Sequence, residues 1–75
     1  MAIIDPSEIP ALEAYMQTTF SNDRIALRER DKAKDSLEVL LNGEFIGVIY
    51  KDDEDGDISY DFNMAILEMD LPKRA

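Results

Sequence analysis

The densest group of potentially reactive side chains is the acidic stretch 52–57, which reads DDEDGD. Five carboxylates around one glycine indicate either a calcium loop or a solvated hairpin turn. With Gly56 at the sixth position of a helix–loop–helix calcium loop, Lys51 and Phe62 would occupy the first and twelfth positions, which need ligands. We therefore expect a turn, with weak divalent-cation binding at 52–57 left open as an alternative.

The rest of the chain restricts the chemistry that it can perform. It contains no cysteine and no histidine, so it lacks thiolate nucleophiles, thiolate metal ligands, disulfides and the commonest general base. Carboxylate catalysis needs two acids held at a fixed separation across a cleft, whereas most acids here fall in predicted turns. We expect no catalytic residues, no metal-ligating residues and no cofactor.

A basic stretch precedes the acidic one. Between Arg24 and Lys34, five cations alternate with Glu29 and Asp31. The pattern is typical of an edge strand protected by charge, and it also suits a phosphate, an acidic partner or the acidic turn of a second copy. The formal net charge of the chain is −9. That charge disfavours nucleic acid and anionic membranes, and it favours a basic protein as partner.

The length of 75 residues allows one small domain, 1–75. The N-terminus shows no basic region followed by a long apolar stretch, and no apolar run is long enough to span a bilayer. We therefore expect a cytoplasmic protein that binds neither membrane nor nucleic acid.

Apolar periodicity predicts the elements that position these side chains. An amphipathic helix is predicted over Asp5–Ser21, because apolar residues recur at three- and four-residue steps at Ile9, Leu12, Met16 and Phe20. Ser7 is the predicted N-cap, since Pro10 then falls in the first turn and costs no hydrogen bond. The alternative is Asp5 as the cap, with Pro6 as the first helical residue.

Four strands are predicted after the helix, over residues 24–30, 36–40, 44–51 and 58–71. Charged connectors separate the first strand from the second and the third from the fourth. The predicted fold is α+β, with an N-terminal helix packed on a four-stranded antiparallel β-meander in the order α-β-β-β-β.

Turn residues predict the register of this sheet. A two-residue type I′ turn at Asp55-Gly56 would pair Ile49 with Phe62 and Tyr50 with Asp61. In the preceding hairpin, a three-residue loop over 41–43 with a bulge is predicted, because it brings the apolar residues of both strands to one face. The residues predicted to lie under the helix are Ile25, Leu27, Leu37, Val39, Phe45, Ile49, Phe62, Met64 and Ile66.

The opposite face of the predicted sheet is also apolar, which is unusual for a solvated antiparallel sheet. Together with a long fourth strand, it favours a homodimer; the alternative is that Leu71-Pro72 folds back over this face. The predicted interface consists of Ile46, Val48, Tyr50, Asp61, Asn63, Ala65, Leu67 and Met69. A non-enzymatic homodimerising interaction module is therefore expected. The alternative function is a small ligand-binding or enzymatic domain with a dimer cleft lined by Tyr50, Asp61 and Asn63.

Three stretches carry a resemblance to a known family: YMQTTF (15–20), EFIGVIY (44–50) and DGDISYDFNMAILEMDL (55–71). In these the chain resembles a family of short, stand-alone alphaproteobacterial proteins catalogued as a domain of unknown function. The resemblance spans nearly the whole chain and implies an α+β fold. It implies no activity, cofactor, partner or functional residue.

Overall fold

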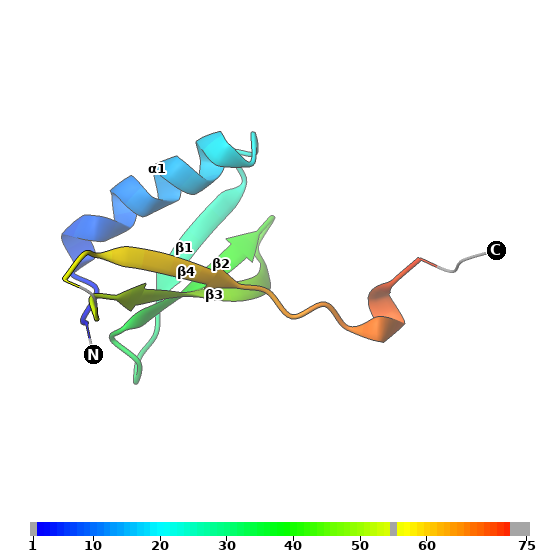
Figure 1. The fold of residues 1–75 in the computed structure, drawn as a ribbon. Helices are drawn as coiled ribbons and strands as arrows, with labels where there is room; N and C mark the ends of the chain where they lie inside the picture. Colours follow the sequence, from blue (N-terminus) through cyan, green and yellow to red (C-terminus); the bar gives the residue numbers. More distant parts are fainter. Residues whose placement is uncertain (1, 55, 73–75) are drawn as a thin grey trace.

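The computed structural model describes residues 2–54 and 56–72, which contain one α-helix, two short 3₁₀ turns and four strands. The elements in order are η1 (Pro6–Glu8), α1 (Ile9–Thr19), β1 (Ile25–Glu29), β2 (Ser36–Leu41), β3 (Glu44–Asp52), β4 (Ser59–Asn63) and η2 (Glu68–Asp70). The strands form a single antiparallel sheet in the order β1-β2-β3-β4, and α1 lies over one face of it (Figure 1). The predicted α+β fold, α-β-β-β-β, is confirmed.

Asp5 caps the helical segment at the 3₁₀ turn η1 that opens it, so the prediction of Ser7 is wrong. The Asp5 carboxylate accepts a hydrogen bond from the Ser7 N–H at 2.9 Å, and the Glu8 carboxylate accepts one from the Asp5 N–H at 2.8 Å. This capping box opens the 3₁₀ turn η1, and the α-helix follows from Ile9. Because η1 comes first, Pro10 still lies in the first turn of α1, where its missing N–H breaks no bond.

The hairpin between β2 and β3 differs from the prediction in where its extra residue lies. Asn42 and Gly43 form a two-residue turn with φ of 54° and 81°, and Leu41 pairs with Glu44. The predicted three-residue loop is therefore wrong. A bulge interrupts the ladder at Ile46 instead. The bulge restores the pairing of apolar residues on the face under α1.

The hairpin between β3 and β4 has the predicted register. Val48 pairs with Asn63, Ile49 with Phe62, and Tyr50 with Asp61. The ladder ends at the Asp52–Ser59 pair, so the connection is longer than two residues. The Gly56 N–H donates to the Asp53 carbonyl at 3.2 Å, whereas Asp55 of the predicted turn lies outside the described residues.

The core lies between α1 and the sheet and also includes the start of the chain. Its buried apolar residues are Ala2, Ile4, Met16, Ile25, Leu37, Val39 and Ile49, with Leu27, Leu41, Ile46, Tyr60 and Phe62 packed against its centre. Three predicted members, Phe45, Met64 and Ile66, are exposed instead. The bulge moves Phe45 to the other side of the sheet, while Ile46, predicted for that side, packs against the core.

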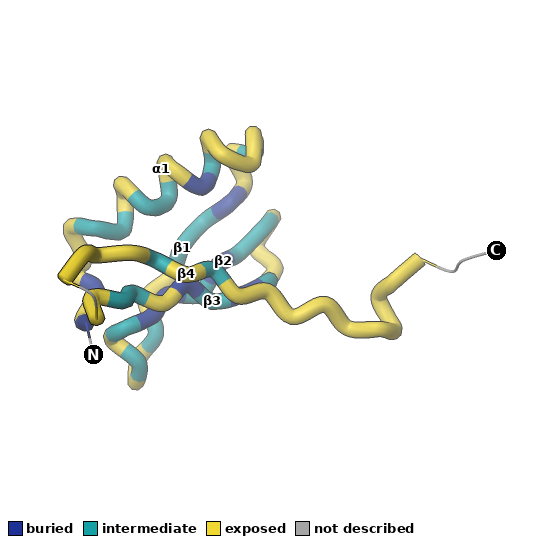
Figure 2. The backbone as a smooth tube through the Cα atoms, in the orientation of Figure 1, coloured by how far each residue is buried: buried dark blue, intermediate teal, exposed yellow. Residues whose placement is uncertain are grey.

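The fourth strand is much shorter than predicted. It ends at Asn63, because Gly47 and the bulge at Ile46 offer the next residues no regular ladder. Residues 64–72, here named the C-terminal arm, extend away from the sheet (Figure 1). Figure 2 shows the arm exposed along its length. The radius of gyration is 13.9 Å, compared with about 11 Å for a spherical domain of this length.

Candidate functional site

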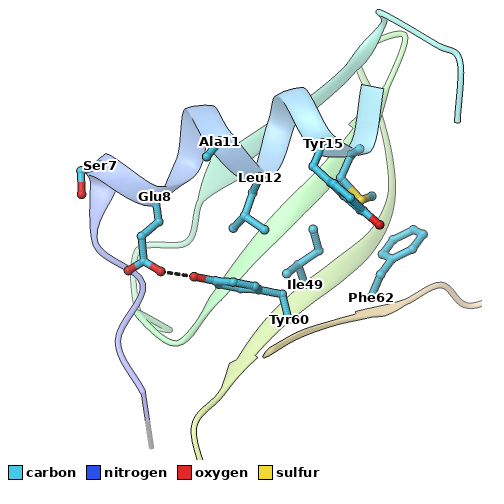
Figure 3. Close-up of a pocket in the computed structure, with 9 residues that line it drawn as sticks. Ser7, Glu8, Ala11, Leu12, Tyr15, Ile49, Tyr60 and Phe62 are labelled. Atoms are coloured by element: carbon cyan, nitrogen blue, oxygen red, sulfur yellow. Dashed lines mark hydrogen bonds between the residues drawn. The ribbon is translucent and has the colours of Figure 1, made fainter. Parts of the chain in front are cut away.

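An open apolar groove separates α1 from β4 on the helix-covered face of the sheet (Figure 3). We name it the β4 groove; its volume is about 580 Å³. It is lined by Ser7, Glu8, Ala11, Leu12, Tyr15, Met16, Ile49, Tyr60 and Phe62. The groove exists because α1 packs closest to β1, which leaves the apolar side chains of β3 and β4 incompletely covered.

The sequence positions the groove walls by two periodicities. Leu12 and Met16 are four residues apart and therefore share one face of α1. Tyr60 and Phe62 alternate along β4 and point toward the helix. Phe62 lines one end of the groove. Its ring meets the ring of Phe20 edge-on at 6.4 Å between centroids, a favourable aromatic geometry.

A network of polar groups around Glu8 closes the other end. One carboxylate oxygen of Glu8, Oε1, accepts a hydrogen bond from the Tyr60 hydroxyl. The other oxygen, Oε2, accepts from Lys51 Nζ at 2.8 Å and from the Asp5 N–H at 2.8 Å. Lys51 Nζ also donates to the Ile3 carbonyl at 3.2 Å. The network joins the N-terminal segment, the 3₁₀ turn η1, β3 and β4.

The network changes the acidity of its members. The hydrogen bonds from Lys51 and Tyr60 hold the pKa of Glu8 at about 2, compared with its usual 4.5. The hydrogen bond to Glu8 raises the pKa of Tyr60, because it stabilises the protonated hydroxyl. Both shifts favour one state, an ionised Glu8 beside a protonated Tyr60. Glu8 and Tyr60 therefore form a structural hydrogen-bonded pair and do not exchange protons near neutral pH.

We name the face of the sheet that points away from α1 the second face. A second hollow lies on it. Its volume is about 650 Å³, and the C-terminal arm forms one of its walls. Of the predicted interface residues, six border it: Ile46, Val48, Tyr50, Asn63, Ala65 and Leu67. Asp61 and Met69 do not border the hollow. Asp61 pairs with Tyr50 across the ladder, and Met69 in η2 is 84% exposed.

The charged stretches form local contacts of their own. The carboxylate of Asp52 accepts the Glu54 N–H at 2.9 Å, and within residues 2–54 and 56–72 no three acidic side chains converge on one point. Arg28 pairs with Glu38 on the neighbouring strand, and Arg24 donates to Asn42 at 3.3 Å. Weak cation binding at 52–57 stays a prediction. No helix of the described chain has the length and apolar character needed to cross a membrane.

Sequence reasoning did not identify the β4 groove or the network at its end. The capping pair Asp5–Glu8 and the alternation of Tyr60 with Phe62 were visible in the sequence. The contact of Glu8 with Lys51 and Tyr60 was not, because it depends on how α1 is placed over the sheet.

The fold and its two open apolar surfaces define a small α+β domain with one helix over an antiparallel sheet. The chain belongs to the family described as Protein of unknown function (DUF3126), which matches residues 8–70. This confirms the resemblance to a family of unknown function. No curated protein and no solved structure matches the chain.

Proposed function

We propose that this protein is a non-enzymatic interaction module that forms a homodimer through the second face and the C-terminal arm. A cytoplasmic location and an alphaproteobacterial range of relatives are parts of the same proposal. The exposed apolar arm is the observation that carries it. Five large apolar side chains of the arm are more than half exposed: Met64, Ile66, Leu67, Met69 and Leu71.

An exposed apolar segment of this size is uncommon on a monomer. Apolar area continues from the arm onto the sheet at Phe45, which is 55% exposed, and Tyr50, which is 40% exposed. Burying each of the arm's large side chains removes roughly 60 Å² or more from water. Two arms and the surfaces that they cover would bury roughly 1,200 Å², which is enough for a stable interface.

The test is sedimentation of the full chain from low to high micromolar concentration. Leu67→Lys should shift the chain to the monomer at every concentration, because it buries a charge in the proposed interface. Val48→Lys should do the same from the sheet side. Ile58→Lys is the matched control, since Ile58 is 60% exposed but does not border the second hollow.

Circular dichroism must show the same fold for all three variants. A wild-type chain that stays monomeric at high micromolar concentration would overturn the proposal. So would a dimer that Leu67→Lys and Val48→Lys leave unchanged.

The second hollow also supports a second candidate function, a small-ligand site completed by the dimer. Tyr50 and Asn63 supply polar groups at its edge, and Asp61 lies opposite Tyr50 on the ladder. A ligand bound there would move the amide resonances of these three residues. If no compound of a broad metabolite panel moves these resonances, this candidate function is excluded.

A further inference from the structure

The two edges of the sheet differ in whether side chains cover their backbone groups. Every exposed edge can pair with another chain. At the β1 edge, the Glu13 carboxylate accepts the Leu27 N–H at 2.9 Å, and Gln17 Nε2 donates to the Ile25 carbonyl at 2.9 Å. Glu13 and Gln17 lie one helical turn apart on α1, so the helix occupies two outward groups of β1, the Leu27 N–H and the Ile25 carbonyl. An incoming strand could pair fully with β1 only by displacing these two side chains.

The β4 edge has no such cover. The Lys51 N–H donates to the Asp35 carbonyl beside β2, at 3.0 Å, which fixes the alternation of β3. In an antiparallel ladder the backbone groups of Tyr60 and Phe62 must then point outward. No hydrogen bond among residues 2–54 and 56–72 reaches these groups. The β4 edge thus presents two free donors and two free acceptors in strand spacing.

The β4 groove runs beside this free edge, as Figure 3 shows for Tyr60 and Phe62. A strand added at the edge would continue the pleat of β4. Its residues level with Tyr60 and Phe62 would face α1 and enter the groove, and those level with Asp61 would face the second face. The groove is apolar between its ends, where Leu12, Met16 and Ile49 line it. Alternate side chains of the added strand should therefore be apolar.

The charge around the β4 edge predicts the type of the remaining side chains of the added strand. Asp61 is exposed in the middle of β4, and Asp52, Asp53, Glu54 and Asp57 lie in or beside the connection at its start. Lys51, on the neighbouring strand β3, is already paired with Glu8. The edge therefore attracts cations. A second copy fits poorly, because its β4 and its arm carry acids at Asp61, Glu68 and Asp70.

We propose that β4 binds an extended segment of a partner protein as a fifth strand, and that this segment alternates apolar and basic residues. Its backbone pairs with Tyr60 and Phe62, its apolar side chains fill the β4 groove, and its basic side chains lie near Asp61. Recognition of this kind draws affinity from main-chain hydrogen bonds and specificity from pockets for alternate side chains. The β4 groove shares no lining residue with the second hollow, and the site meets the second face only at Asp61.

The probe is a synthetic peptide of about six residues, the usual length of a strand, alternating valine and lysine with blocked termini. Hydrogen exchange is the most specific readout. The amides of Tyr60 and Phe62 should exchange fast in the free chain and become protected when the peptide is added. The Leu27 amide, already bound by Glu13, should not change. Two control peptides carry glutamate in place of lysine, or N-methyl groups on the amides, and neither should bind.

Two pairs of variants test the side-chain contacts. Asp61→Lys should weaken peptide binding by about tenfold, because it replaces an attraction by a repulsion, whereas Glu29→Lys reverses an exposed acid on the opposite edge and should have no effect. Ala11→Phe should fill the groove and abolish binding. Ala14→Phe places the same ring on an exposed helical position outside the groove and should bind like the wild type.

Three results would overturn the proposal. One is peptide binding without protection of Tyr60 and Phe62. Another is equal binding of the N-methylated peptide, which would show charge attraction alone. The last is no binding at a large excess of the alternating peptide. Leu67→Lys tests the dimer and leaves the β4 edge intact. Failure of the dimer proposal can therefore be distinguished from failure of the strand-addition proposal.

Discussion

The Tyr60 hydroxyl donates a hydrogen bond to Glu8 Oε1 across 52 positions of the sequence. This contact connects β4, an edge strand, to the 3₁₀ turn that opens the helix. The second oxygen of Glu8 is shared between Lys51 on β3 and the Asp5 N–H. A single carboxylate thus holds the helix cap, β3 and β4 together at one end of the β4 groove.

Removing the Tyr60 hydroxyl should destabilise the fold modestly. Tyr60→Phe keeps the ring against the core and loses one hydrogen bond to a charged group, so we expect the melting temperature to fall by about 5 °C. Thermal unfolding followed by circular dichroism measures the change. Tyr15→Phe is the control, because Tyr15 also lines the groove but is 67% exposed. Equal shifts for the two variants would contradict a stabilising role for the Glu8 contact.

The same carboxylate should make the stability depend on acidity. Folding lowers the pKa of Glu8 from 4.5 to about 2, through hydrogen bonds from Lys51 and Tyr60. The folded state therefore binds this proton less readily than the unfolded state. The contribution of Glu8 is fully present above about pH 4.5 and is lost as the pH falls through 2. The hydrogen bond from the Ser7 backbone lowers the pKa of Asp5 and acts in the same direction.

Urea unfolding at a series of pH values measures this dependence. Between pH 4.5 and 2, Glu8→Gln should show a flatter dependence of the unfolding free energy on pH than the wild type. Glu29→Gln, which alters an exposed acid on β1, should follow the wild-type curve. The assignment would be wrong if both variants matched the wild type in this range.

A side chain at Gly47 should displace β4. A Cβ atom there would overlap the Asn63 carbonyl oxygen and lie 2.7 Å from Cε1 of Phe62. Because the first obstacle is backbone, Gly47→Ala should cost about 1–3 kcal/mol of unfolding free energy. Gly43→Ala is the contrasting variant, since a Cβ there has open space and only the positive φ of 81° opposes it. Urea unfolding with resonance shifts at Phe62 and Asn63 separates the two, because only Gly47→Ala should move β4.

Side chains alternate between the two faces of a strand, and this alternation predicted the register of β3 against β4. A shift of one residue would move Phe62 out of the core. The same reasoning failed in the preceding hairpin. Alternation requires one extra residue between Val39 and Ile49, but it does not say where that residue lies. The turn Asn42-Gly43 takes two residues, and the extra one is Ile46.

Other features depend on placement that no local pattern encodes. Ala2 and Ile4 are buried, and the Ile4 N–H donates to the Lys34 carbonyl at 2.8 Å, although neither residue belongs to a periodic segment. The end of β4 at Asn63 falls inside a continuous apolar run. The β4 groove was missed for the same reason, because it arises from the position of α1 toward β1.

The cover of the β1 edge should depend on the acceptor at Glu13. Glu13→Ala leaves the Leu27 N–H without its partner, so we expect loss of about 1 kcal/mol of unfolding free energy and fast hydrogen exchange at Leu27. The uncovered edge should also make the chain associate beyond the proposed dimer at high concentration. Glu13→Gln keeps an oxygen acceptor and should preserve both the protection and the monodispersity. If Leu27 stays protected in Glu13→Ala, another group occupies this edge, and the contrast between β1 and β4 would no longer rest on the helix.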